Sequence, residues 1–269
     1  MVSCGSGFPV GTTKAGAESF IRQSTHTSAS WNSPVGHLIP SRLTEPSTRC
    51  SARLPFQRWY ATAPADFLFA VKGARFITRM KKLREVQIPL ANFFASGLLC
   101  LEEKLGPILW QFPPNLGWNE MRFREFFQLL PRNTEEAAQL ARLHDNKLKA
   151  RAWLRTDASR PLRYAVEIRH PSFLAAEFFA FLREVRAALV FADTAGRWPY
   201  AEELTTDFAY IRLHGDSELY VSGYEDSVLR SWAKRIRNWN RSRDVFVYFD
   251  NDAKVRAPFD ARRLTELLS

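Results

Sequence analysis

The chain has 269 residues, of which 46% are hydrophobic and 13% aromatic, and this length and composition suit one large core. Its net charge of +10 favours acidic partners such as phosphates, nucleic acid or an anionic surface. The three cysteines form neither an even framework nor a metal-binding spacing, and no apolar run approaches the ~18 residues of a membrane helix, which excludes a disulfide scaffold and a membrane-spanning protein. We therefore expect a cytoplasmic protein without membrane partners.

The first 55 residues show neither a helical period nor strand alternation. A representative stretch is "SRLTEPSTRCSARL", Ser41–Leu54, whose Ser/Thr-rich composition cannot bury a core. We therefore expect residues 1–55 to lie outside the folded domain, which we place at residues 56–269.

From Trp59 onward, short β-branched or aromatic runs alternate with helical patterns, as is typical of repeated βα units. Helices are predicted between the strands, for example at residues 89–106, 227–240 and 258–268. The predicted strands are residues 67–72, 107–112, 163–169, 187–193, 208–215 and 245–252.

Near-continuous apolar strands flanked by helices indicate a parallel sheet that is covered on both faces. No Gly-x-Gly-x-x-Gly motif follows any strand, which favours a closed barrel over an open dinucleotide-binding sheet. The predicted fold class is therefore α/β, a TIM-barrel-like (βα)8 fold. Such a barrel needs eight strands. Two strands are missing, and we expect them upstream, in the segment without pattern.

Seven segments of the chain resemble the YecE-like family, domain of unknown function 72, which is a TIM-barrel-like family. The resemblance runs in order from about Phe56 to Leu268. It implies the fold but no reaction, because the family has no settled activity. The segments are "FAVKGARFIT", "LGPILWQFPPNL", "VEIRHPSF", "ADTAGRWP", "YIRLHG", "LYVSGY" and "VYFDNDAKVRAPFDA".

The first two strands of that family are absent or out of frame in this chain. Family members open with Gly-x-x-Gly-Trp and continue to a strand similar to Val-Glu-Ile-Asn-Gly-Thr-Phe-Tyr-Ser-Leu-Gln-Arg. Suitable codons for Ser41–Leu54, read one base earlier, encode that second segment. We hypothesise a one-base insertion or deletion near the codons for Leu54 to Phe56. The alternatives are a genuine divergent extension and an organelle transit peptide.

Polar side chains gather at the ends of the predicted strands, where TIM-barrel active sites lie. Glu167 or Asp193 would act as general base or metal ligand, and His170 or His214 as general acid or ligand. No cofactor is identified, although a divalent metal could bind Asp250 and Asp252. The predicted ligand-binding residues are Lys72, Gln111, Arg169, Arg212 and Asn251.

Each of these assignments has a structural alternative. Glu167 and Arg169 lie on one face of their strand and could form an internal ion pair. His214 could be a core histidine beside Gly215. The run Asp250–Asp252 could form a turn or cap a helix. Arg79 also stands where family members often carry histidine.

The sequence thus predicts a protein that binds a small anionic or phosphorylated ligand at the strand ends and hydrolyses or isomerises it. The alternative is a nucleic-acid-binding or nuclease-like protein, because residues 229–243 interleave basic residues with Trp232 and Trp239. Against this, Leu229, Trp232, Ile236 and Trp239 recur at helical spacing, which predicts the buried stripe of a barrel helix. Whether the protein is an enzyme, and its oligomeric state, stay open.

Overall fold

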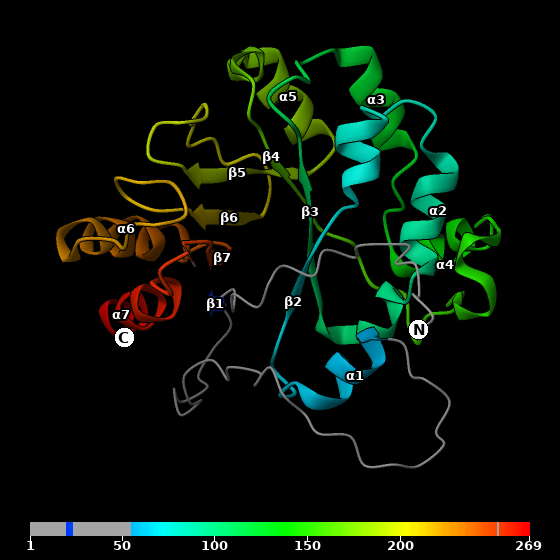
Figure 1. Ribbon diagram of the computed structural model, residues 1–269, viewed down its shortest axis with the longest axis horizontal. Coiled ribbons are helices and arrows are strands. Elements are labelled where there is room, and N and C mark those ends of the chain that lie inside the picture. The colour runs from blue at the N-terminus through cyan, green and yellow to red at the C-terminus, as the bar shows by residue number, and fades with distance from the viewer. Residues whose placement is uncertain (1–19, 24–54, 252) are drawn as a thin grey trace, which may run out of the picture. The chain divides into compact units, whose positions relative to one another are not determined.

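The computed structural model describes residues 20–23, 55–251 and 253–269 (Figure 1). The chain divides into two compact units. Unit 1 consists of residues 1–46, 192–197 and 211–269, and unit 2 consists of residues 47–191 and 198–210. Strands β5 (Ala187–Asp193) and β6 (Phe208–Leu213) contribute residues to both units.

Unit 2 is built on parallel strands. Besides β5, these are β2 (Phe69–Lys72), β3 (Leu105–Gln111) and β4 (Tyr164–Glu167), and β2 to β5 pair in parallel in this order (Figure 1). In the register of β3 and β4, Gln111 lies opposite Glu167. The carboxyl ends of the two strands therefore stand side by side.

The helices of unit 2 alternate with its strands. Two of them begin at asparagine caps: the Asn119 side chain accepts from Arg122 N at 3.0 Å and that of Asn133 from Glu136 N at 2.9 Å. The helical segments are α1 (Pro55–Thr62), η1 (Phe76–Met80), α2 (Gln87–Ala95), η2 (Leu98–Lys104), α3 (Glu120–Gln128), α4 (Thr134–Ala141), η3 (Asn146–Arg151), η4 (Pro171–Leu174) and α5 (Ala176–Glu184).

The single helix predicted at residues 89–106 is wrong. Gly97 has a φ of 108°, a left-handed conformation that ends α2 and starts η2. Leu105 already begins β3, so Gly106 lies in a strand and does not end a helix. The local composition favoured one helix, and the glycine backbone divides it.

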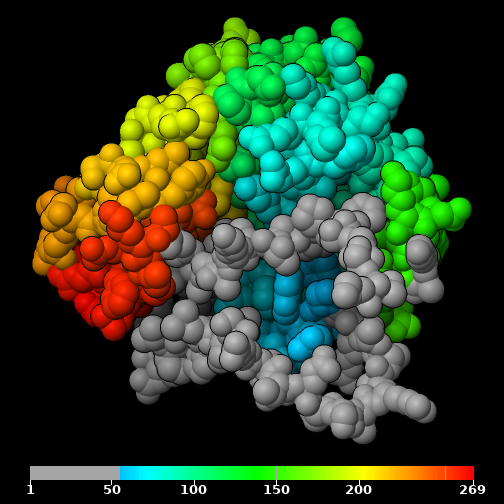
Figure 2. Space-filling model, viewed as in Figure 1, coloured from blue at the N-terminus to red at the C-terminus, as the bar shows by residue number. Residues whose placement is uncertain are grey.

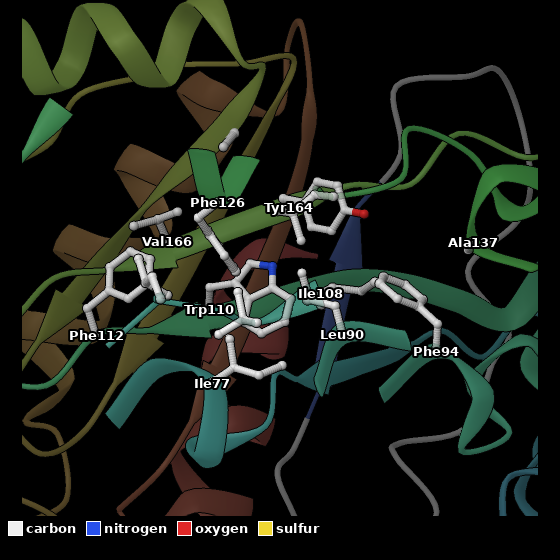
Figure 3. Close-up of a cluster of buried hydrophobic side chains, with 14 of the residues drawn as sticks. Ile77, Leu90, Phe94, Ile108, Trp110, Phe112, Phe126, Ala137, Tyr164 and Val166 are labelled. Atoms are coloured by element: carbon white, nitrogen blue, oxygen red, sulfur yellow. The ribbon is translucent and has the colours of Figure 1, made fainter. Parts of the chain in front are cut away.

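The core of unit 2 is rich in aromatic side chains (Figure 3). The ring of Trp110 is fully buried and meets Phe126 edge to face, with ring centroids 5.2 Å apart. Gly73 approaches this ring so closely that an added Cβ would lie 2.2 Å from Trp110 Cε3. The glycine therefore makes room for the tryptophan.

Unit 1 contains the end of β6, β7 (Asp244–Phe249), α6 (Asp226–Trp239) and α7 (Ala257–Leu268). Helices α6 and α7 lie side by side on its surface (Figure 2), where Arg263 Nε donates to Asp226 Oδ1 at 2.6 Å. Leu229, Trp232 and Ile236 are buried, whereas Trp239 at the end of the helix is half-buried, so the buried stripe predicted for α6 is confirmed for three of its four residues.

The hydrogen-bonded strand order is β1-β7-β6-β5-β4-β3-β2. The predicted α/β class is confirmed, since all six predicted strands are present in sequence order and alternate with helices. The segment in which we expected the first two barrel strands lies mostly outside the described residues. One strand that we did not predict, β1 (Phe20–Gln23), pairs antiparallel with β7, whereas a βα barrel needs parallel strands.

Candidate functional site

Glu167, at the end of β4, is fully buried and closely tied to its neighbours. Its Oε1 accepts from Gln111 Nε2 at 2.6 Å, from Arg169 Nε at 3.1 Å and from Arg169 Nη2 at 3.0 Å. The Arg169 guanidinium also lies over the Trp198 ring, 5.3 Å from its centroid. Three predicted site residues therefore meet within unit 2, in the arrangement that the internal ion pair alternative describes.

The other two predicted residues of unit 2 are His170 and Lys72. His170 Nδ1 accepts from Ser172 N at 3.2 Å and lies 2.8 Å from Ser172 Oγ, so the imidazole caps the short helix η4. Lys72 ends β2 with an exposed side chain. His170 Nδ1 is therefore engaged in a contact that stabilises the start of η4.

The predicted residues of unit 1 gather through backbone pairing at the strand ends. His214 N donates to Asp193 O at 2.9 Å, and Asp250 N donates to Leu213 O at 2.8 Å. These bonds continue the ladders past β6 and β7. They bring Asp193, His214 and Asp250 onto three adjacent chain segments.

Asp250 is shared between a histidine and an arginine. Its Oδ2 lies 3.0 Å from His214 Nδ1 and 2.8 Å from Arg212 Nη2. His214 is fully buried, whereas the Asp250 side chain is 27% exposed. The His214 contact has a close distance but not the direction of a good hydrogen bond, and His214 Nε2 has no partner among the described residues. The imidazole therefore has a carboxylate beside Nδ1, while Nε2 could form a hydrogen bond with another group.

Asp193 adds a second carboxyl group to unit 1. Burial raises its pKa above the ordinary value of 3.8, and hydrogen bonds from the Ala195 backbone and the Tyr224 hydroxyl oppose this rise. The Tyr224 hydroxyl also accepts from Gly215 N at 3.1 Å. Tyr224 therefore links Asp193 to the residue that follows His214.

Asn251 is fully buried and strictly oriented. Its Nδ2 donates to Ser222 O at 2.9 Å and to Asp260 Oδ2 at 2.7 Å. Asp260 Oδ2 also accepts from Tyr224 N at 3.2 Å, and burial raises the pKa of this carboxyl group. Asn251 Oδ1 has no partner among the described residues. Because Ser222 O and Asp260 Oδ2 both accept from Nδ2, the orientation of the amide is fixed and Oδ1 is its unpaired atom.

Sequence reasoning missed Tyr224 and Asp260. Tyr224 is the last residue of "LYVSGY", and Asp260 interrupts the buried face that Ala257, Ala261 and Leu264 give to α7. A buried acid on an apolar helix face was the available signal, since such a group needs a partner.

The prediction of a metal at Asp250 and Asp252 stays a prediction. Asp250 contacts the Arg212 guanidinium, and Asp252 lies outside the described residues. One group of acidic side chains in the described part of the chain could hold an ion together, and it contains none of the predicted residues. This group is Glu102, Glu103 and Asp157.

The segment behind the nucleic-acid alternative is helix α6. The Trp232 ring is only 2% exposed, and the Arg235 guanidinium lies 3.6 Å from its centroid. Arg230 Nε donates to Asp226 Oδ2 at 2.6 Å. Trp232 therefore has no open face for a nucleic-acid base. The alternative still has the half-buried Trp239 and the positive charge of the helix in its favour.

A family model for "Protein of unknown function DUF72" matches residues 50–269, which is most of the chain. The chain belongs to the DUF72 family. The resemblance to the YecE-like family is thereby confirmed, and the match begins six residues upstream of the predicted boundary at Phe56. A search of curated proteins found no match to this DUF72 chain.

Solved DUF72 proteins share the fold. A DUF72 family protein of Enterococcus faecalis V583 is 17% identical, with a TM-score of 0.61 over 79% of this chain and 78% of the other. A DUF72 family protein of Thermotoga maritima MSB8 is 24% identical, with a TM-score of 0.58 over the same shares. At these identities the likeness shows the fold alone. In the described part of this DUF72 chain, no helix is both long and apolar enough to cross a bilayer.

Proposed function

We propose that this DUF72 protein binds a small anionic or phosphorylated ligand at the carboxyl ends of β6 and β7 and transfers a proton to or from it, in a hydrolysis or an isomerisation. His214 exchanges the proton, Asp250 positions the imidazole, and Arg212 contributes positive charge. Roles for Lys72, Gln111, Glu167, Arg169 and His170 in unit 2 stay predictions.

The pairing of His214 with Asp250 carries the proposal. A carboxylate 3.0 Å from Nδ1 favours a proton on that nitrogen, which leaves Nε2 as a base. Nε2 has no partner among the described residues, so it is available to a bound ligand. Asp193, whose pKa is raised by burial, is a second group able to hold a proton in unit 1.

The test is a titration of the full chain, labelled with 15N at histidine, with inorganic phosphate and glucose 6-phosphate. We expect the His214 Nε2 resonance to shift on addition of a ligand, and His214→Gln to lose at least about tenfold in affinity. His144→Gln is the matched control, because His144 is not among the predicted site residues, and it should bind as the wild type does. If neither compound shifts the His214 resonance, the proposal is wrong. Assays of released phosphate and of the recovered sugar then separate hydrolysis from isomerisation.

We propose further that the parallel strands belong to a (βα)8 barrel, as the family resemblance implies, and that a frame error upstream of Phe56 accounts for the two strands not recognised in this sequence. Resequencing of the DNA across the codons for Pro40 to Trp59 tests this. A one-base difference that encodes the expected second strand would support it, and unchanged bases would contradict it.

A further inference from the structure

Two buried polar atoms of unit 1, Asn251 Oδ1 and His214 Nε2, have no partner among the described residues. Both belong to residues just past the ends of neighbouring strands, since His214 follows β6 and Asn251 follows β7 by two positions. An unpaired buried polar group destabilises the folded state, so two such atoms in one region call for an explanation.

One loop, residues 215–222, covers both side chains. The Tyr220 ring packs edge to face against His214, with centroids 5.3 Å apart, and Tyr220 N donates to His214 O at 2.5 Å. Ser222 O accepts from Asn251 Nδ2 at 2.9 Å. Both atoms therefore lie beneath the same loop within unit 1.

Both atoms are hydrogen-bond acceptors. The Asn251 amide cannot be turned around, because Nδ2 faces two oxygens, Ser222 O and Asp260 Oδ2. A neutral His214 that carries its proton on Nδ1, toward Asp250, presents Nε2 as an acceptor as well. A bare phosphate oxygen would repel both acceptors, whereas a hydroxyl group would donate to either.

We infer that this part of unit 1 binds the hydroxyl groups of its ligand, so that the ligand is a hydroxylated compound such as a phosphorylated polyol or sugar. Asn251 Oδ1 accepts from one hydroxyl group and His214 Nε2 from a second. This inference rests on the proposed function and narrows its ligand class.

Three probes separate the hydroxyl groups from the charge. Glycerol 3-phosphate carries both, n-propyl phosphate has the same carbon number and charge but no free hydroxyl group, and sorbitol has hydroxyl groups but no charge. Isothermal titration calorimetry of the full chain with each probe gives the affinities. We expect glycerol 3-phosphate to bind at least about tenfold more tightly than n-propyl phosphate, because two buried acceptors are satisfied by the first and left unpaired by the second.

The variant Asn251→Ala should bring the two phosphate esters to within about threefold of each other. Asn238→Ala, at an exposed position of α6, is the matched control and should keep the full preference. The wild-type comparison stands by itself if Asn251→Ala fails to fold.

Each outcome decides the inference. Equal binding of the two esters overturns it while the proposed anionic ligand stands. Binding of sorbitol without either ester supports the hydroxyl sites and contradicts the anionic ligand. No binding of any of the three overturns both.

Discussion

Two buried polar clusters, one in each unit, lie at strand ends but differ in how their atoms are paired. In unit 2, Glu167 is held by Gln111 and Arg169 through contacts of 2.6 to 3.1 Å. In unit 1, His214 and Asn251 are equally buried, yet His214 Nε2 and Asn251 Oδ1 have no partner in the described part of the chain. Burial of the polar side chains therefore does not distinguish the two clusters, whereas the state of their hydrogen bonds does.

The largest effect on stability is expected from a substitution that breaks the Glu167 cluster of unit 2. Arg169→Ala removes the guanidinium that pairs with the buried Glu167 carboxylate, and we expect a loss of about 3–5 kcal/mol in the free energy of unfolding. Urea denaturation at neutral pH measures it. The control is Arg183→Ala, which removes an exposed pair with Glu203 and should cost under about 1 kcal/mol. Equal losses in the two variants would contradict the supporting role of the Glu167 cluster.

A second change compares the packing of the two units. Gly73→Ala in unit 2 forces a methyl group to within 2.2 Å of the Trp110 ring, and we expect a cost of about 1–3 kcal/mol from overpacking. At Gly223 in unit 1, the nearest atom to an added Cβ is Arg256 Cδ at 3.5 Å, an ordinary contact. Gly223→Ala should therefore change the free energy of unfolding by about 0.5 kcal/mol or less. Thermal unfolding of both variants checks the ranking, and a reversed order would refute it.

His214→Gln tests the difference between the two polar clusters directly, because His214 in unit 1 is as buried as Glu167 in unit 2. Its ring nitrogens make no well-directed hydrogen bond among the described residues, so little is lost when it is replaced. We expect the free energy of unfolding to fall by about 1 kcal/mol or less. A loss of unfolding free energy as large as that of Arg169→Ala would show that His214, like Glu167, mainly stabilises the fold.

The smallest effect concerns pH. Burial raises the pKa of Asp193 in the folded state, aided by the charge of Asp216 and opposed by the hydrogen bond from Tyr224. The folded state then binds more protons than the unfolded state above pH 3.8, so this group reduces stability as the pH rises through the folded pKa. Asp193→Asn should remove that decline. Urea denaturation from pH about 4 to about 7 tests it, and parallel curves for both proteins would be inconsistent with the raised pKa.

The sequence predicted those features that depend on neighbouring residues. Apolar strands and helical spacing gave the order of the elements and the buried side of α6, including Trp232. The division of the helix at Gly97 was not predicted, because a glycine is also tolerated inside a helix. Strand β1 was also missed, because its pairing with β7 joins positions far apart in the chain.

The candidate site was predicted as a set of strand-end residues but not as a network. Alternation along β4 placed Glu167 and Arg169 on one face, and their ion pair agrees with this. The contacts of Tyr224 and Asp260 depend on which loops meet which strand ends, and one sequence does not contain that information. The unpaired state of His214 Nε2 and Asn251 Oδ1 is likewise a property of three-dimensional packing.

The Tyr220 contact has a consequence for kinetics. His214 has no exposed surface while the Tyr220 ring lies against it, and Tyr220 O accepts from Ala253 N at 3.0 Å. A ligand of the proposed kind would therefore reach Nε2 only after these contacts break. Its association would then have two steps, and we expect the observed rate to level off at high ligand concentration, at the rate at which the loop opens.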